Sequence, residues 1–456
     1  MVAQARRQQV TAALFALHAF LGSVALAACA SSKEPVAPVP SGTATTTTTS
    51  AESLPFIHDD FPRALAQAKK EDKPLFVDAW APWCHSCMSL KTYVLTDPSL
   101  APLAKDFVWL AVDTEKDVNA SWVQKYPHDA LPTLWIIDPA TEKPLLKWAG
   151  TATAPELKAL LTASISNDPS MAAFIRGNHA LADGDVKLAL KEHGAALNAT
   201  KPGSESYARI AEAMVTELSL SKDHDGCVQL ASNAAPVMPA GTSRASVLVA
   251  GLGCARDAKN TEARDRLLAL ATHDATTHDA SILPDDRSAL YEEIVQTTKD
   301  AGSEASAKKI ATEWATYLEG EAKKAATKDA RTALDPWRVA AYIATGEPAK
   351  AIPVLEESAR DFPQDYNPHA RLGRVYLVLG RLDEAAKSAD RAIALVYGPR
   401  AMRVYELRAD VAKAKGDKAA EIRALEEALA KSERANLTVG QRAVREKMQK
   451  RLGALR

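Results

Sequence analysis

Two cysteines separated by two residues are the strongest chemical signal in this sequence. Cys84 and Cys87 lie in residues 80–87, which read WAPWCHSC. The apolar run 74–79 before them is typical of a buried strand, and residues 88–95 after them are typical of a helix. The first turn of a helix has unpaired N–H groups and a partial positive charge, which favour a thiolate at Cys84. Cys87 lies one turn further on, so its sulfur is placed to attack a mixed disulfide formed at Cys84.

Other roles for this pair are weaker. Zinc would need a second pair of ligands at a suitable spacing, and the sequence has no second Cys-x-x-Cys. Covalent haem attachment would need a histidine at position 88, which is Met88. A purely structural disulfide is the serious alternative. The sequence therefore predicts redox exchange at this pair, with no metal and no cofactor.

The elements that position the cysteines alternate between strand and helix signals from residue 56 to residue 167. The helix after the cysteines should stop before Asp97-Pro98, because the residue before a proline avoids the helical conformation. The pattern predicts strands at 75–80, 107–112, 133–137 and 144–148, and helices at 60–70, 118–126 and 155–165.

From about residue 169 onward the strand signals end, and an Ala- and Leu-rich helical pattern repeats about every 34 residues. The copy at 369–397 is the most regular, 173–200 has the same internal spacing, and 205–330 is helical with a looser pattern. Small residues allow two helices to pack closely, and a glycine marks the turn between them. These copies resemble tetratricopeptide repeats, which implies stacked helix pairs with a concave face that binds a partner.

The segment 56–167 resembles a thioredoxin-fold domain, through Asp78, the stretch 80–87 and Leu131-Pro132-Thr133. The resemblance implies a sheet flanked by helices, with Cys84 as the exposed nucleophile and Cys87 as the resolving thiol. It implies a cis peptide bond at Pro132 beside the cysteines, and a buried Asp78 that relays the proton of Cys87. The alternatives are a plain trans loop proline and an ordinary polar residue at a strand end.

The residues that flank the cysteines depart from cytosolic thioredoxin. His85 and Ser86 replace its Gly-Pro, Met88 replaces a usual basic residue, and the following helix lacks an internal proline. With Trp83 before the motif, the stretch looks closer to the thioredoxin-like domains of exported reductases. A protonated His85 should stabilise the thiolate and make the pair more oxidising.

The N-terminus has the pattern of an export signal. A basic start with Arg6 and Arg7 precedes the mostly apolar residues 10–26, and the segment ends in Leu-Ala-Ala-Cys at Cys29. This ending resembles the bacterial lipoprotein cleavage box and implies a lipid anchor on Cys29; an uncleaved membrane anchor is the alternative. Ala30 after the cysteine favours the outer membrane, with the protein on the periplasmic side of the cell envelope.

We therefore expect a multidomain chain: a thioredoxin-like α/β domain followed by an all-α domain of tetratricopeptide-like helical repeats. The expected boundaries are a lipoprotein signal peptide at 1–28, a disordered Pro/Thr-rich tether at 29–54, the thioredoxin-like domain at 55–167 and the repeats at 168–456. Cys227 and Cys254 are expected to form a structural disulfide, with free buried thiols as the alternative.

The functional prediction is a membrane-tethered extracytoplasmic thiol–disulfide oxidoreductase, working as a reductase or isomerase on exported proteins with thiols or disulfides. It needs an electron donor that the sequence does not identify, and its repeats would bind a client or partner protein. A formal net charge of -1 gives no electrostatic reason to bind nucleic acid. The alternative is an envelope assembly scaffold, in which the repeats bind partners and the thioredoxin-like domain is a docking module.

Overall fold

The structure is a computed structural model that describes residues 54–128, 130–166, 168–182, 184–433 and 437–456. The predicted signal peptide, Cys29 and the predicted tether up to residue 53 lie outside the described residues. Leu54, the last residue of the predicted disordered tether, is described and is buried in the core of the α/β unit, so the predicted boundary is wrong at that residue. The described chain has an N-terminal α/β unit followed by a long helical array, which confirms the predicted fold class.

The α/β unit contains a five-stranded sheet in the order β1-β3-β2-β4-β5. Strands β1, β3 and β2 are parallel, whereas β4 and β5 are antiparallel to their neighbours. The elements are β1 (Phe56–His58), α2 (Phe61–Glu71), β2 (Leu75–Trp80), α3 (His85–Ser89), η1 (Leu90–Val94), η2 (Pro98–Lys105), β3 (Val108–Asp113), η3 (Asp117–Asn119), α4 (Ala120–Lys125), β4 (Thr133–Ile137), β5 (Pro144–Ala149) and α5 (Ala154–Ser164). The central strand, β2, leads directly into the cysteine motif.

Most of the predicted elements of this unit are confirmed within one or two residues. Helix α2 begins after Asp60, whose side chain accepts a hydrogen bond from the backbone N–H of Arg63. Helix α5 begins after Thr153, which forms a capping box with Glu156. The short strand β1 and the 3-10 helix η2 were not predicted, because three residues and a proline-containing segment carry little periodicity.

The helical array contains α6 (Pro169–Ala182), α7 (Val186–Ala199), α8 (Glu205–Leu220), α9 (His224–Ala234), η4 (Ala235–Val237), α10 (Thr242–Asp257), α11 (Thr261–Thr276), α12 (Pro284–Asp300), α13 (Glu304–Lys324), α14 (Lys328–Ala333), α15 (Asp335–Ala344), η5 (Pro348–Lys350), α16 (Ala351–Asp361), α17 (Tyr366–Val378), α18 (Leu382–Leu395), α19 (Ala401–Ala414), α20 (Lys418–Lys431) and α21 (Val439–Leu455). Five turns between paired helices have a left-handed glycine, and φ lies between 71° and 83° at all of them: Gly184, Gly302, Gly346, Gly380 and Gly416. This periodic placement confirms the predicted role of glycine at the repeat turns.

Small residues bring the repeat helices close together, as the pattern predicted. A Cβ atom added to Gly373 on α17 would lie 2.8 Å from Leu407 Cδ2 on α19. Ala385, Ala389 and Ala392 of α18 are fully buried against neighbouring helices. The stacked pairs therefore share a continuous apolar interior.

The two faces of the sheet are covered differently. Helices α2 and α4 cover one face, where Ala64 and Trp122 pack against Val77. On the other face, α5 packs on the sheet together with Phe174 of α6 and Ile210 of α8. The first helices of the array therefore share a hydrophobic core with the sheet instead of following a flexible linker.

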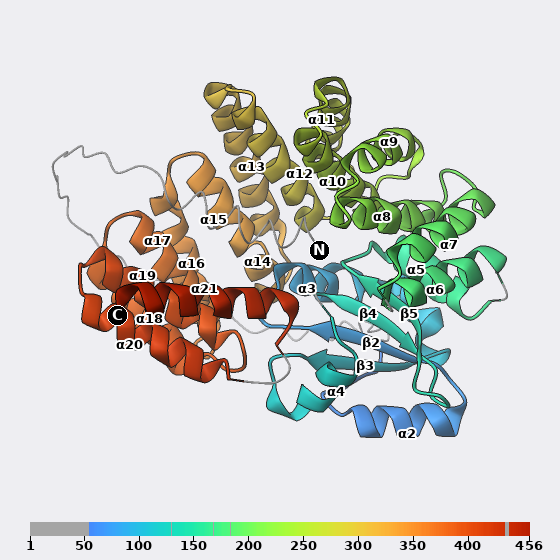
Figure 1. Ribbon diagram of the computed structural model, residues 1–456, viewed down its shortest axis with the longest axis horizontal. Helices are drawn as coiled ribbons and strands as arrows, with labels where there is room; N and C mark the ends of the chain where they lie inside the picture. The colour runs from blue at the N-terminus through green and yellow to red at the C-terminus, as the bar shows by residue number, and fades with distance from the viewer. Residues whose placement is uncertain (1–53, 129, 167, 183, 434–436) are drawn as a thin grey trace, which may run out of the picture.

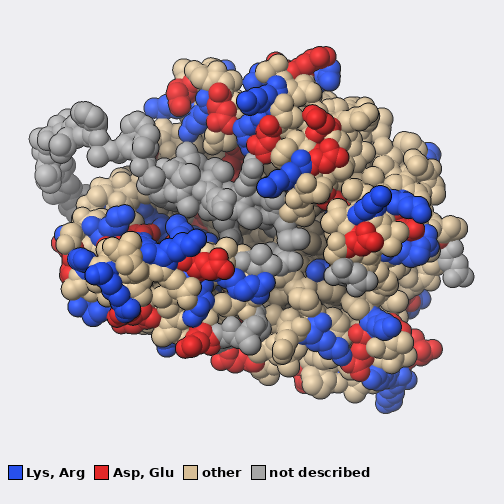
Figure 2. Space-filling model, viewed as in Figure 1, with Lys and Arg blue, Asp and Glu red and all other residues tan. Residues whose placement is uncertain are grey.

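The helical array curves around the α/β unit, so that α3 lies on its inner side (Figure 1). Helices α12 and α14 both pack against α3. On the face seen in Figure 2, acidic and basic side chains are interspersed over the array, in keeping with the net charge near zero. The active-site end of the sheet therefore lies against the inner side of the array.

Candidate active site

The cysteine pair lies at the point where β2 ends and α3 begins. Cys84 is the N-cap residue of α3, and the backbone N–H of Cys87 donates a hydrogen bond to the Cys84 sulfur at 3.1 Å. The two sulfurs form a disulfide, and only 3% of Cys84 and none of Cys87 is exposed. The expectation of an exposed Cys84 is therefore wrong for this oxidised structure, in which helices of the array pack against the motif. An N–H directed at the Cys84 sulfur would stabilise a thiolate there after reduction.

Ser86 connects the cysteine motif to the loop before β4. Its hydroxyl lies 3.5 Å from the Cys84 sulfur and 3.5 Å from the carbonyl oxygen of Leu131. The Leu131-Pro132 peptide bond is cis, and the carbonyl of Pro132 accepts a hydrogen bond from Gly150 on the far side of the loop. The structure thus brings Pro132 to the motif, where the resemblance placed it.

Asp78 lies in the centre of β2 and is completely buried. Neither of its carboxylate oxygens has a hydrogen-bond partner among the described residues. Burial raises the pKa of Asp78 to about 6, although attraction to the ammonium of Lys91 opposes the rise. A carboxyl group with this pKa exchanges a proton readily near neutral pH, as a proton relay requires.

Lys91 is the basic partner of Asp78, and sequence reasoning missed it. It lies in η1, a π-helical turn that continues α3, and its ammonium group is 2.9 Å from the centre of the Trp80 ring. Burial lowers the pKa of Lys91 to about 8, while attraction to Asp78 and Asp113 opposes this fall. Lys91 lies four residues after Cys87, and this spacing was the available signal, although η1 is a π-helical turn and not an α-helical one.

The helical array contacts His85, the residue that follows Cys84. His85 Nδ1 lies 2.6 Å from Oδ1 of Asp285 at the start of α12. The same oxygen accepts a hydrogen bond from Trp337 Nε1 of α15 at 2.6 Å, and the Trp337 ring lies edge-on to the His85 ring at 4.7 Å. A side chain within the motif is therefore held by two helices far away in the sequence.

A second contact holds Trp83, the residue that precedes Cys84. Its ring N–H donates to Glu115 Oε1 at 2.9 Å, and Glu115 Oε2 accepts from the backbone N–H of Arg400 at 2.7 Å. The Arg400 guanidinium lies 4.5 Å from the centre of the Trp83 ring. Asn367 of α17 donates to the carbonyl oxygen of Pro82 at 3.1 Å. The C-terminal repeats thus contact the loop that precedes Cys84.

The pKa shifts of Glu115 and Arg400 show that water is excluded from this second contact. Burial raises the pKa of Glu115, although the hydrogen bond from Trp83 opposes the rise. Burial lowers the pKa of Arg400 to about 10. Charged groups shift in this way when water is excluded around them, so the contact is a packed interface.

The predicted second disulfide, between Cys227 and Cys254, lies away from this site. Cys227 on α9 and Cys254 on α10 are joined by a disulfide and are almost fully buried. They lie in the loosely patterned part of the repeats, where the link fastens two neighbouring helices.

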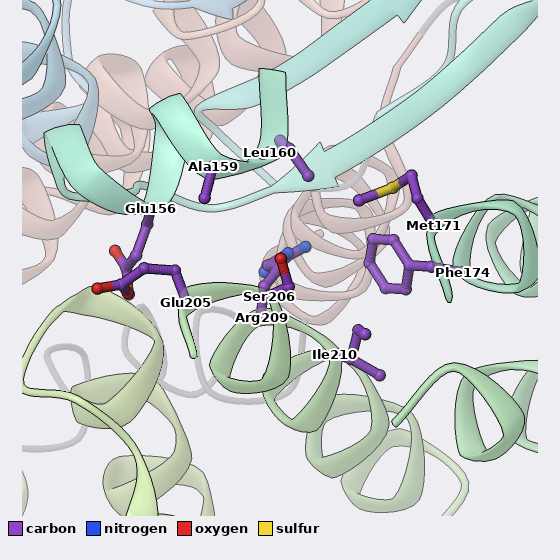
Figure 3. A pocket seen from close by; sticks show the side chains of 9 residues that line it. All are labelled: Glu156, Ala159, Leu160, Met171, Phe174, Glu205, Ser206, Arg209 and Ile210. Atoms are coloured by element: carbon purple, nitrogen blue, oxygen red, sulfur yellow. The ribbon is translucent and has the colours of Figure 1, made fainter. Parts of the chain in front are cut away.

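A small pocket lies between α5, α6 and α8, away from the cysteine motif (Figure 3). Its lining combines apolar side chains with Glu156 and Glu205. Burial raises the pKa of Glu205, and the nearby charge of Glu156 raises it further. Within the ranges that the structure describes, no group of three or more His, Cys, Asp or Glu side chains is arranged to bind a metal ion. No helix in those ranges is long and apolar enough to cross a membrane.

Comparison with known proteins matches both parts of the chain. Residues 57–139 match the thioredoxin-like family model, and residues 342–401 match the tetratricopeptide repeat model. The chain therefore has an N-terminal thioredoxin-like domain with a Cys-x-x-Cys disulfide, followed by tetratricopeptide repeats.

Two similar proteins are both named thiol:disulfide interchange protein DsbD. The one from Pseudoalteromonas atlantica is 28% identical over 82 residues, which is 18% of this chain and 14% of that protein. The one from Vibrio vulnificus is 34% identical over 59 residues, which is 13% of this chain and 10% of that protein. This chain thus matches only a small part of their length. A solved tetratricopeptide repeat protein from Parabacteroides merdae has a TM-score of 0.37 and 11% identity, covering 61% of this chain and 98% of that one.

Proposed function

We propose that this protein is a thiol–disulfide oxidoreductase that works outside the cytoplasm on exported proteins. The observation that carries the proposal is the position of Cys84, at the N-cap of α3 with the Cys87 N–H directed at its sulfur. Matches to proteins named for thiol:disulfide interchange support it. The second disulfide, Cys227–Cys254, supports an oxidising compartment, because such bonds persist there and are rare in the cytosol.

In the proposed reaction, the reduced Cys84 thiolate attacks a substrate disulfide. A Cys84–substrate disulfide forms and one substrate sulfur leaves as a thiolate. Cys87 then loses its proton to the Asp78 carboxylate and attacks the Cys84 sulfur, which releases the second substrate thiolate. Two electrons have then passed to the substrate, and the enzyme is left with its Cys84–Cys87 disulfide and a proton on Asp78. The two substrate thiolates take up protons from solvent, and Asp78 returns its proton to solvent.

The other residues at the site have supporting roles in this proposal. The loop that carries Leu131 and Pro132 lies beside the motif, and a substrate segment would align along it. A dithiol protein must reduce the disulfide again in each cycle, so an electron donor is required. The repeats, which already reach the motif through His85 and Trp83, would select a client or the donor.

The finer expectations from the sequence remain part of the proposal. These are a lipid anchor on Cys29, location on the periplasmic side of the envelope with the outer membrane favoured, and net reduction or isomerisation instead of net oxidation. Replacing Cys29 by alanine should release the exported protein from the membrane fraction. Metabolic labelling with a fatty acid should mark the wild type and not this variant, and an unlabelled wild type would exclude the lipid anchor.

A trapping experiment tests the proposed reaction. The Cys87→Ala variant should accumulate covalent mixed disulfides with its substrates, because the resolving thiol is missing. The matched control replaces Cys227 and Cys254 by alanine and should show no such adducts. Wild-type protein should reduce insulin disulfides, whereas Cys84→Ser should not; full activity of Cys84→Ser would refute the assignment.

A scaffold is the second candidate function, and one observation favours it. The helical array contacts Trp83 and Pro82 in the loop before Cys84, so the thioredoxin-like domain is docked against the array. A scaffold would capture its partners without covalent bonds, and this capture would survive replacement of both motif cysteines. Covalent adducts that depend on Cys84 would instead favour the oxidoreductase.

A further inference from the structure

The residue next to the nucleophilic cysteine is bonded to a part of the chain that lies outside the thioredoxin-like domain. His85 Nδ1 and Asp285 Oδ1 are 2.6 Å apart, and the two residues are separated by 200 positions in the sequence. The Trp337 N–H donates to the same carboxylate oxygen at 2.6 Å. Since an indole N–H can only donate, this Asp285 oxygen is the acceptor for Trp337.

This geometry fixes which nitrogen of His85 carries a hydrogen. An ionised carboxylate only accepts hydrogen bonds, so the Nδ1 atom of His85 must donate to Asp285. The Trp337 ring lies edge-on to the imidazole at 4.7 Å and limits its rotation.

Burial gives the Asp285 charge its influence on the motif. Only 5% of Asp285 and 27% of the His85 side chain are exposed to solvent. Charges interact more strongly in such surroundings than in water. The next two charged residues on α12 bond elsewhere: Asp286 accepts from the Thr242 hydroxyl, and Arg287 donates to the backbone carbonyl oxygens of Asp274 and Asp279.

We propose that Asp285 is a positioning residue of the redox site, supplied by the helical array. It holds the His85 ring through Nδ1, so that the positive charge of a protonated imidazole stays beside the Cys84 thiolate. The attraction between these two charges exists only after the disulfide has taken up two electrons, because the oxidised pair has no thiolate. Asp285 therefore favours the reduced form and raises the reduction potential of the Cys84–Cys87 pair. The inference rests on the proposed redox function.

The consequence is that the helical array takes part in redox tuning. A displacement of α12 from the motif, for example when the array binds a client, would remove the carboxylate from His85. By thermodynamic linkage, the array would then bind the motif more tightly in its reduced state than in its oxidised state.

The test is a double-mutant cycle on the reduction potential of the full chain. Four proteins are compared: wild type, Asp285→Asn, His85→Ala and the double variant. Each is equilibrated with a series of dithiol/disulfide buffers, and the reduced fraction of the Cys84–Cys87 pair is measured by thiol labelling and mass spectrometry. Asp286→Asn is the matched control, because this neighbouring carboxylate on α12 bonds to Thr242.

Asp285→Asn should lower the equilibrium constant for reduction by threefold to tenfold in the wild-type background. Tenfold corresponds to about 30 mV for this two-electron couple. In the His85→Ala background the same substitution should cause no fall, and Asp286→Asn should cause none in either background. Retained near-ultraviolet circular dichroism of Asp285→Asn checks that the array still packs.

Two results would overturn the inference in different ways. An equal fall with and without His85, or a rise in both backgrounds, would show that Asp285 does not act through His85. A Cys84–Cys87 pair that stays oxidised in every buffer, in wild type too, would refute the proposed function and with it this inference. A reversible wild-type couple with no effect of Asp285→Asn would refute the inference alone.

Discussion

The Asp78→Asn substitution tests directly how the buried carboxyl group affects the protein. Burial raises the pKa of Asp78 from 3.8 to about 6, and one pKa unit corresponds to about 1.4 kcal/mol. At pH 7.5 an ionised Asp78 therefore lowers the free energy of unfolding by about 3 kcal/mol. Asparagine has nearly the same shape without the charge. The variant should be more stable by about 3 kcal/mol, because the pKa of about 6 already includes the opposing attraction to Lys91.

The sign of the pH dependence follows from the direction of the shift. Between about pH 4 and pH 6 the folded chain keeps the Asp78 proton, while the unfolded chain has lost it. The free energy of unfolding of the wild type should therefore fall as the pH rises through this window. The advantage of Asp78→Asn should be small at pH 3.5 and fully developed at pH 7.5.

The assay is urea unfolding of the oxidised proteins at these two pH values, followed by tryptophan fluorescence. Midpoints are compared at equal slopes, so that they report stability. Asp138→Asn is the control, because hydrogen bonds from Thr141 and Ala140 lower the pKa of that exposed carboxyl. It should give no stabilisation at pH 7.5. Equal stabilisation by Asp78→Asn at both pH values would refute the argument from ionisation.

The remaining predictions concern neighbouring parts of the same structure. Lys91→Met removes the charge that opposes the rise in the pKa of Asp78. The pH profile of the rate of disulfide exchange should therefore move to higher pH by about 0.5 to 1 unit. An unchanged profile would show that Lys91 does not influence proton transfer by Asp78. Trp83→Phe keeps an aromatic ring but removes the N–H that donates to the buried carboxylate of Glu115. The substitution should lower the free energy of unfolding by about 1–3 kcal/mol. Proteolysis of the C-terminal repeats should also become faster. Replacing Cys227 and Cys254 by alanine opens a link with a sequence separation of 27 and should lower stability by about 3 kcal/mol in urea, with insulin reduction unchanged; a parallel loss of activity would contradict a purely structural role.

The local features of the site could be predicted because they depend on short-range patterns. A strand, a Cys-x-x-Cys turn and a helix follow one another in the chain, and the N-cap geometry of Cys84 is a property of that sequence order. Left-handed glycines such as Gly380 recur at the repeat period, because the turn between two packed helices needs a backbone that side chains disfavour.

Lys91, the basic residue near the buried Asp78, could not be identified from local sequence patterns. Met88 occupies the position of a usual basic residue, so the sequence suggested that a positive charge was missing. In the structure, the π-helical turn after α3 directs Lys91 to this region, over the ring of Trp80. A change from α-helical to π-helical turn rotates every later side chain, and apolar periodicity does not encode that change.

The sequence by itself determined the redox motif, the order of strands and helices, and the periodic turns of the repeats, since each depends on residues close together in the chain. Only the tertiary structure decided that the array bends back onto the motif, that Asp285 bonds His85 and that Arg400 lies over Trp83. Those contacts join side chains about 200 to 300 positions apart. They follow from the accumulated curvature of many stacked helices and from a core shared between the sheet and the first helices. No single segment carries that information, because each helix pair contributes only a small rotation to the path of the array.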